Sequence, residues 1–213
     1  MRILLCLLLV LAACSRPLTE NEVAFAEDLY GPSLDTSNVR VSLGLGILPP
    51  PKLKKTGVRV LVGTDKACVR TPQPRGAQPP QAFALRNGLH FDPGLYSDDM
   101  ALGWPKARRF PQTLIFAHEL AHVWQWQNRE TTGYSAFRAI MESVRLADPY
   151  FSASGAHELF YRFGYEQQAA IIEDYLCFTF ANPHHPRRAE LRAVLEPVLP
   201  LDRFDEVVRT RER

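Results

Sequence analysis

The chain has 213 residues, of which 46% are hydrophobic and 23% are charged. This composition is typical of a globular protein with one sizeable core, and it excludes a disordered chain or a low-complexity fibre. Lysine and arginine total 25 against 23 acidic residues, so the formal net charge of +2 provides no basic field that would hold nucleic acid.

The N-terminus has the pattern of an export signal. Arg2 precedes an apolar stretch, residues 3–13, that is too short to cross a bilayer as a helix and is typical of a signal peptide. The junction Ala13-Cys14-Ser15 resembles the lipobox of bacterial lipoproteins. The resemblance implies cleavage after residue 13, lipidation of Cys14, and an outer-membrane lipoprotein that faces the periplasm. The alternative is an ordinary cleaved signal and a secreted or periplasmic protein.

Cleavage would leave residues 14–213, which we expect to form a single domain. Besides Cys14, this part of the chain holds only Cys68 and Cys177. In an oxidising periplasm the two could pair, and closing so long a loop would add up to roughly 4 to 5 kcal/mol. Two buried free thiols are the alternative, because spacing alone does not establish a bridge.

The first predicted elements are a helix and two strands. Thr19 and Glu22 have capping-box spacing, which predicts a helix over residues 20–30. β-Branched and aliphatic residues predict strands over residues 39–48 and 57–62.

A loop and a β-hairpin follow. Residues 71–80 contain four prolines and are predicted to form a loop. Asn87-Gly88 lies between two short apolar runs and predicts a hairpin over residues 82–91, because both residues tolerate the positive φ of a type I′ turn.

From residue 111 onward the pattern becomes helical. Apolar residues all round predict a buried helix over residues 111–128, followed by helices over about 135–146 and 165–180. The tail is predicted to contain one further amphipathic helix around residues 191–198, and its last dozen residues are charged and expected to fray. These elements together predict an α+β protein.

The strongest chemical signal lies in the first of these helices. His118-Glu119-Leu120-Ala121-His122 is an H-E-x-x-H motif. Residues four apart project from one helical face, so His118 and His122 could bind one Zn²⁺ with Glu119 beside the open position. The alternative is a pair of core histidines that neighbouring residues satisfy.

Two ligands do not hold zinc firmly, so a third is expected downstream. We choose Glu166, because Ala169 and Ala170 on the same helical face would let the two helices approach closely. Glu173 is about 10 Å further along the axis, and either Glu173 or Asp174 is expected to orient a histidine from outside the ligand shell. The other candidates for the third ligand were His157, Glu158, His184 and His185.

These motifs carry a family resemblance. The segment 116–125 around the first motif, followed by 163–169 and 171–175, resembles small gluzincin-type zincins related to vgr proteins of type VI secretion spikes. It is also similar to the metallopeptidase-like domain of extracellular contractile injection systems. The resemblance covers about residues 82–180 and implies a zincin-like α+β fold, a small sheet on the active-site helix, and Glu166 as the third ligand. It also suggests that an edge strand of the hairpin, residues 83–86 or 89–91, receives an extended peptide; the alternative is a plain sheet hairpin.

The expected chemistry is zinc-dependent peptide hydrolysis. Glu119 would take a proton from water activated by the metal and deliver it to the leaving amine. His157, Tyr161 and Tyr165 lie just before Glu166 and are candidate donors to the developing oxyanion, with His157 and Tyr165 preferred.

The sequence therefore predicts a membrane-anchored zinc metallopeptidase that cleaves a peptide or protein in the bacterial cell envelope. One alternative is a catalytically inactive zincin-fold lipoprotein that acts as a binding or assembly module. Another is an amidase that acts on cell-wall material with the same metal chemistry. The sequence does not indicate an oligomeric state.

Overall fold

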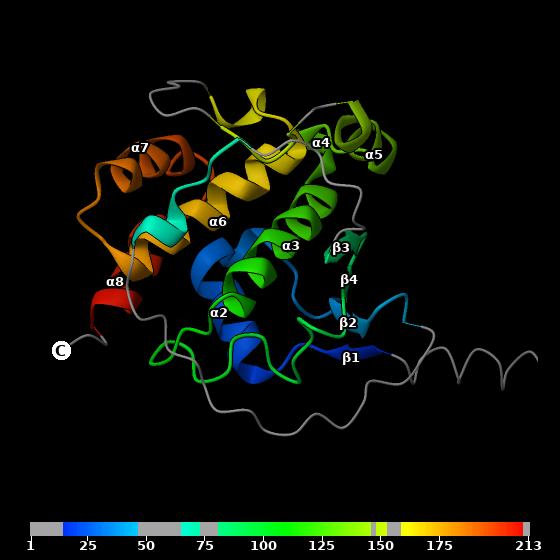
Figure 1. Ribbon diagram of the computed structural model, residues 1–213. Coiled ribbons are helices and arrows are strands. Elements are labelled where there is room, and N and C mark those ends of the chain that lie inside the picture. The colour runs from blue at the N-terminus through cyan, green and yellow to red at the C-terminus, as the bar shows by residue number, and fades with distance from the viewer. Residues whose placement is uncertain (1–14, 47–64, 73–80, 146–147, 153–158, 211–213) are drawn as a thin grey trace, which may run out of the picture.

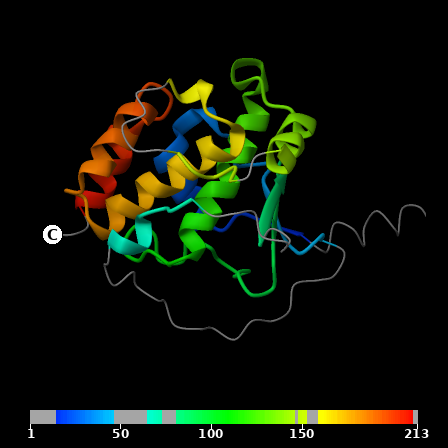
Figure 2. The same ribbon diagram turned by 45° about the horizontal axis from the view of Figure 1, so that its top comes forward.

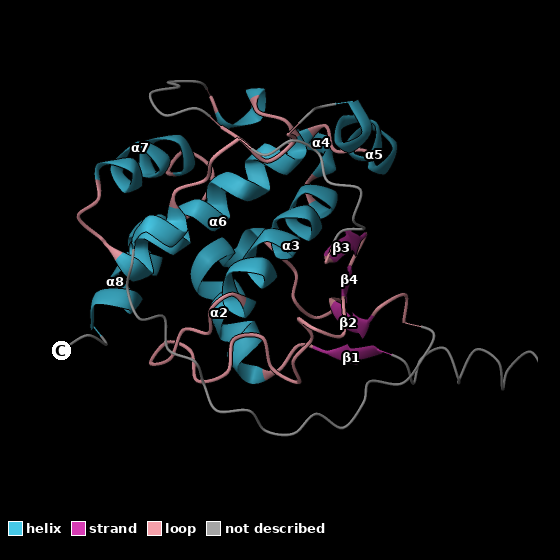
Figure 3. Ribbon diagram, in the orientation of Figure 1, coloured by secondary structure: helices cyan, strands magenta, loops and turns pink. Residues whose placement is uncertain are grey.

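The computed structural model describes residues 15–46, 65–72, 81–145, 148–152 and 159–210 (Figure 1). Within these residues the chain is an α+β protein with seven α-helices and a small mixed sheet. Figure 3 shows the strands gathered on one side of the helices. None of the helices in these ranges is both long and apolar enough to cross a membrane.

The sheet has the strand order β1-β2-β4-β3. Its strands are β1 (Ser15–Pro17), β2 (Arg40–Leu43), β3 (Ala82–Leu85) and β4 (Gly88–Phe91). β2 pairs with β4 in parallel, whereas the other two pairings are antiparallel. β3 is therefore an edge strand of the sheet. The sequence did not predict β1. Its three residues, next to the predicted cleavage site, are too few to show the alternation of apolar and polar residues that marks a strand.

The predicted hairpin is confirmed, but its turn is displaced by one residue. Leu85 pairs with Gly88, so the turn consists of Arg86 and Asn87, and Gly88 begins β4. Arg86 takes the positive φ of 54°, which is unusual for a residue with a side chain. This register places Leu89 and the other inward residues of β4 in the core, and burial of one face fixes the register of a strand.

The predicted strand over 39–48 is shorter than expected. β2 ends at Leu43, and Gly44 and Gly46 both have positive φ in the turn that follows. The predicted strand over 57–62 and most of the predicted loop over 71–80 lie outside the described residues.

The first helix, α2 (Glu20–Tyr30), begins as predicted. The Thr19 side chain accepts from the backbone of Glu22, and the Glu22 carboxylate accepts from the backbone of Thr19. At the other end of the helix the Tyr30 hydroxyl donates to the carbonyl of Ala117 at 3.0 Å. α2 is thereby tied to the helix that carries the H-E-x-x-H motif.

That helix, α3 (Gln112–Gln127), lies at the centre of the molecule. It packs against β3 and β4 on one side and against α6 (Tyr165–Ala181) on the other. Figure 2 shows α6 running alongside α3, with the hairpin on the opposite side. Because α3 is apolar all round, it is buried along most of its length, as the sequence predicted.

Two short α-helices lie between α3 and α6 in the part of this connection that the structure describes. α4 (Arg129–Thr132) was not predicted, and α5 (Ala136–Arg145) corresponds to the helix expected over about 135–146. Glu142 of α5 accepts a hydrogen bond from the backbone N–H of Tyr165 at 2.6 Å. A carboxylate at this place stabilises the N-terminus of α6, which is the end that carries Glu166.

The C-terminal region differs from its prediction. It forms two helices, α7 (Pro186–Leu195) and α8 (Leu201–Thr210), instead of one helix and a frayed tail. Phe204 and Val208 of α8 are buried against the core, which outweighs the charged residues between them. The prediction failed because it rested on the charged residues of the tail, whereas the apolar residues spaced three and four apart form one face of a helix that the core covers.

A disulfide joins Cys68 to Cys177, with the two Cα atoms 5.5 Å apart. It ties a 3₁₀ turn (Asp65–Cys68) to α6 across 109 residues of sequence. Of the two alternatives that the sequence left open, the structure has the bridge.

Candidate metal centre

The two histidines of the motif lie side by side on α3. His118 and His122 are one helical turn apart, and their ring centroids are separated by 5.1 Å. Both are more than nine-tenths buried, at 7% and 6% exposure. Imidazoles buried this deeply need polar partners.

Glu166 of α6 supplies the common partner. Its Oε2 atom lies 3.2 Å from Nε2 of His118 and 3.3 Å from Nε2 of His122. One ligand atom from each of the three residues lies within 4.8 Å of the other two. The predicted third ligand is thus brought to the predicted pair.

The remaining ring nitrogens are held by side chains outside this group. Nδ1 of His118 donates to Glu173 Oε2 at 3.1 Å, and Nδ1 of His122 donates to Gln125 Oε1 at 2.9 Å. The Gln125 amide nitrogen donates to two further oxygens, of Tyr165 and Gln168, which fixes the orientation of the amide. Partners of this kind set the tautomer of metal-binding histidines and leave both Nε2 atoms as possible ligands.

In the protein without metal these groups form a charged network. Burial lowers the pKa of His118, but hydrogen bonds to Glu166 and Glu173 outweigh this and raise it to about 10. Burial also lowers the pKa of His122, but the charge of Glu166 and a hydrogen bond to it outweigh this and raise the pKa. Burial raises the pKa of Glu166, and the two imidazoles reverse this and hold it well below its ordinary value. The network therefore carries protons that a metal ion would displace.

Glu119 lies in the same buried region but is bonded differently. Its side chain is 5% exposed, and its Oε2 atom has no hydrogen-bond partner among the described residues. Burial raises the pKa of Glu119 to about 6, although the positive charges of His118 and His122 act in the opposite direction. A buried carboxylate oxygen without a partner indicates a site that a ligand completes.

The residues fit a divalent metal ion. The group offers two imidazole nitrogens and one carboxylate oxygen, a set that transition-metal ions such as zinc accept. Each of the two histidines has its own hydrogen-bond support, and Glu119, an acid with an unsatisfied oxygen, lies in the same buried region. The geometry itself does not select one metal.

Two tyrosines near the group were not predicted from the sequence. Tyr150 lies with its ring 5.8 Å from that of His118. Burial, together with the charges of Glu166 and Glu119, raises the pKa of both Tyr134 and Tyr150 to about 12. Both phenols therefore interact electrostatically with the acids of the site. Because their pKa is raised, both stay protonated at neutral pH and can donate hydrogen bonds.

Some predicted site residues lie elsewhere. The Tyr165 hydroxyl donates to the carbonyl of Gly133 at 2.6 Å, so it is engaged away from the histidines. Asp174 binds Arg70, with its Oδ1 atom 3.0 Å from Nη2, and orients no histidine in the part of the chain that is described. The structure does not describe His157 and Glu158.

The histidine pair before α7 has another role. Nδ1 of His185 accepts from the backbone of Arg187 as the N-cap of α7, and its ring stacks on Phe178. His185 is thus engaged in capping α7 and in packing on Phe178. His184 and His185 do not belong to the His118, His122 and Glu166 group.

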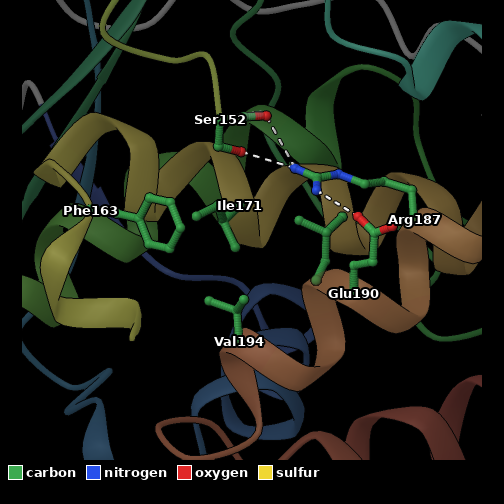
Figure 4. Close-up of a pocket in the computed structure, with 7 residues that line it drawn as sticks. Ser152, Phe163, Ile171, Arg187, Glu190 and Val194 are labelled. Atoms are coloured by element: carbon green, nitrogen blue, oxygen red, sulfur yellow. Dashed lines mark hydrogen bonds and ion pairs between the residues drawn. The ribbon is translucent and has the colours of Figure 1, made fainter. Parts of the chain in front are cut away.

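Two cavities lie beside α6. The smaller, about 10 Å³, has room for about one water molecule and lies beneath an ion pair of Arg187 with Glu190 (Figure 4). Arg187 also donates to the side chain and carbonyl of Ser152, which holds this loop over α6. The larger cavity, about 210 Å³, lies between α3, α6 and the 3₁₀ turn, and Glu173 is one of its lining residues.

Comparisons with known proteins give one match. No family model and no curated protein matches the chain. Among solved structures, the effector domain of Pseudomonas aeruginosa VgrG2b is similar, with a TM-score of 0.52 and 23% sequence identity. The alignment covers 86% of this chain and 83% of that one. At this identity the likeness concerns the fold, and it agrees in part with the resemblance to vgr-related proteins.

Proposed function

We propose that the protein is a zinc metallopeptidase with a zincin-like fold, in which His118, His122 and Glu166 hold the ion. The observation that carries this proposal is the convergence of two Nε2 atoms on one oxygen of Glu166. Catalytic zinc sites use three protein ligands of this kind and keep a fourth position for water. When bound, zinc supplies a Lewis acid that activates water and polarises a carbonyl group.

Glu119 is the proposed general base. Its carboxyl group is buried, interacts with both imidazoles, and has an oxygen available to accept a proton. In the proposed reaction, Glu119 takes a proton from the water that attacks the amide carbon and delivers it to the leaving nitrogen. The C–N bond breaks, and the products are a carboxylate and an amine.

Tyr134 and Tyr150 are the proposed donors to the carbonyl oxygen as negative charge develops on it. Burial and the charges of Glu166 and Glu119 raise the pKa of both hydroxyls, so both remain protonated at neutral pH. A donor that faces this charge is typically worth several kcal/mol in acyl-transfer enzymes, about 2.7 to 4 for one oxyanion-hole donor. They replace Tyr165, whose hydroxyl is bonded to Gly133.

The proposed substrate is an extended peptide. β3 is an edge of the sheet and packs beside α3, the helix that carries the ligands. A peptide that pairs with such an edge gains main-chain hydrogen bonds without strict sequence choice. The proposal therefore predicts broad cleavage within extended segments.

We also propose that the protein works in the bacterial cell envelope, held by lipid on Cys14. The lipobox-like sequence before Ser15 supports this location. A lipidated chain would stay at the membrane surface without a spanning helix. Its expected partners are the membrane and a peptide or protein substrate.

A second role uses the same chemistry. The similar solved structure is itself an effector domain, which favours an effector role, and the export signal of this chain would place that role in an envelope. Export of the chain into the periplasm of a test bacterium should then stop growth in a manner that depends on Glu119. An envelope enzyme of the producing cell would be tolerated.

The test of the proposed function is Glu119→Gln. The variant should keep about one zinc per chain and lose about 10²- to 10⁴-fold of its peptide hydrolysis, the range typical of a general base. Glu130→Gln, on the exposed surface of α4, is the matched control and should leave both quantities unchanged. Zinc content is measured by elemental analysis, and hydrolysis with a mixed peptide library.

Other outcomes identify the alternatives. Wild-type protein that holds zinc but cleaves no peptide would favour the binding or assembly module. Release of products from peptidoglycan fragments, with no cleavage of linear peptides, would favour the cell-wall amidase.

A further inference from the structure

Arg70 lies at the outer side of the metal centre. Its Nη2 atom is 3.1 Å from Glu173 Oε2 and 3.0 Å from Asp174 Oδ1. Its Nε atom contacts Asp174 at 3.3 Å. The guanidinium therefore spans two consecutive acids of α6.

The contact with Glu173 reaches the centre directly. The same Oε2 atom that accepts from Arg70 also accepts from Nδ1 of His118, again at 3.1 Å. A row of hydrogen bonds thus runs from Arg70 through Glu173 to a ligand histidine. Arg70 fixes where the carboxylate of Glu173 lies, so the orientation of the imidazole depends on both residues.

Little else in the described structure holds Arg70 in this position. Its side chain is 27% exposed, so solvent partly screens its ion pairs with Glu173 and Asp174. A cavity of about 210 Å³, lined on one side by Leu114 and Ile115, lies beside the contact and gives the side chain room to turn away.

The disulfide provides the missing constraint. Cys68 is two residues before Arg70, and Cys177 is four residues after Glu173, one turn further along α6. The bridge therefore fixes the backbone beside Arg70 to the helix that carries its acidic partners. No other covalent link joins these two elements in the described part of the chain.

We propose that Arg70 is a positioning residue for His118 and that the disulfide of Cys68 with Cys177 tightens the metal site by holding Arg70 against Glu173. The inference rests on the metal site of the proposed function. It goes beyond that function because it makes metal affinity depend on a bridge that touches neither metal nor substrate. A bridge that only stabilised the fold would leave metal affinity unchanged.

The experiment measures the zinc dissociation constant of the intact protein by competition with a chromogenic chelator. Arg70→Met should weaken zinc binding by about tenfold, the lower end of the effect of removing an outer partner of a ligand. Arg70→Lys keeps the charge and should recover part of that loss. Arg188→Met is the matched control, since it removes another partly buried ion pair, with Asp205, away from the centre.

The bridge is tested in the same assay. The double variant Cys68→Ser/Cys177→Ser removes the bridge and leaves no free thiol, and it needs no reductant; thiols and reductants would bind zinc themselves. It should weaken zinc binding about as much as Arg70→Met does. Adding Arg70→Met to this variant should cause little further loss, because both changes remove the same support.

The outcomes separate this inference from the proposed function. Wild-type protein that binds no zinc would contradict the function itself. Zinc binding that Arg70→Met leaves unchanged would overturn the inference alone, as would additive losses from Arg70→Met and removal of the bridge. If the variant without the bridge does not fold, Arg70→Met and Arg70→Lys still decide the role of Arg70.

Discussion

The chemistry of the centre depends on which nitrogen of each histidine is available. Glu173 and Gln125 accept from the two Nδ1 atoms, and both Nε2 atoms face Glu166. The H-E-x-x-H spacing predicted the pair of histidines, but it does not indicate which side chains accept from their Nδ1 atoms.

Gln125→Leu should therefore weaken metal binding without removing a ligand. We expect a loss of about 10- to 100-fold in zinc affinity, the usual effect of removing an outer partner, measured by chelator competition. Gln127→Leu is the control on the same helix, because Gln127 bonds to Asp35 and Asn87 instead of to a ligand. It should lower stability and leave zinc affinity unchanged; equal losses in both variants would contradict the assignment.

The stability of the metal-free protein should depend on pH through the same residues. The pKa of folded His118 is about 10, above the value of about 6.5 in an unfolded chain, so its stabilising effect is complete below pH 6.5. That effect is lost as the pH rises through 10. The pKa of Glu166 is held low, so its contribution is present above about pH 4.5 and is lost as the pH falls.

The melting temperature of chelator-treated protein should thus fall between pH 6 and pH 10. A loss of 1 kcal/mol corresponds to about 2–4 °C at this chain length. A variant with both His118→Gln and His122→Gln is the control for general effects of alkaline pH and should fall much less. A melting temperature that stays constant or rises in the wild type would contradict the charged network.

At the scale of elements, the centre is a contact between α3 and α6. Ala169 and Ala170 are fully buried in α6, and Ala169 lies between Glu166 and Glu173 on one helical face. Small residues at this place permit the close approach that the sequence analysis expected. The N-terminus of α6 is held in addition by Glu142 of α5, which no pattern predicted.

Ala169→Leu should separate the two helices. Added volume in a well-packed contact costs about 1–3 kcal/mol, and here it would also move Glu166 away from the histidines. We expect a lower midpoint in denaturant unfolding and zinc affinity reduced by more than tenfold. Ala189→Leu, at an exposed position of α7, is the control. Unchanged zinc affinity in Ala169→Leu would show that the close contact does not set the position of Glu166.

Long periodic elements were predictable, and short or mixed ones were not. α3 and α6 followed from sustained apolar patterns, and the capping box of α2 from two residues. β1 and α8 were missed because their stability comes from partners distant in sequence: β2 for the strand and the core for Phe204. The turn of the hairpin was displaced because burial of β4, a tertiary property, outweighed the local preference of Asn-Gly.

At the scale of the whole molecule, the residues of the site also divide into those that the sequence predicted and those that it did not. His118, His122 and Glu166 were named from motif spacing and a helical face, and the structure brings them together. Tyr134, Tyr150 and Arg70 could not be named, since each reaches the centre from a loop or turn whose path depends on the complete fold. The disulfide was left open for the same reason.

The proposed attachment to a membrane also concerns the whole molecule. β1 begins at Ser15, the residue after Cys14, so a lipid there would keep the sheet close to the bilayer. Cys14→Ala should move the protein from the membrane fraction to the soluble fraction of expressing cells and abolish incorporation of a labelled fatty acid. Cys6→Ala is the control and should change neither; a wild-type chain that takes up no fatty acid would contradict the lipid anchor.

The central claim is that two helices bring three side chains to one metal ion, and metal analysis of the purified protein tests it most directly. Wild-type protein should contain about one equivalent of zinc, whereas Glu166→Ala and His118→Ala should each lose it and remain folded by circular dichroism. The claim would be contradicted by a folded wild type that neither contains nor takes up a divalent ion, or by variants that keep the full equivalent.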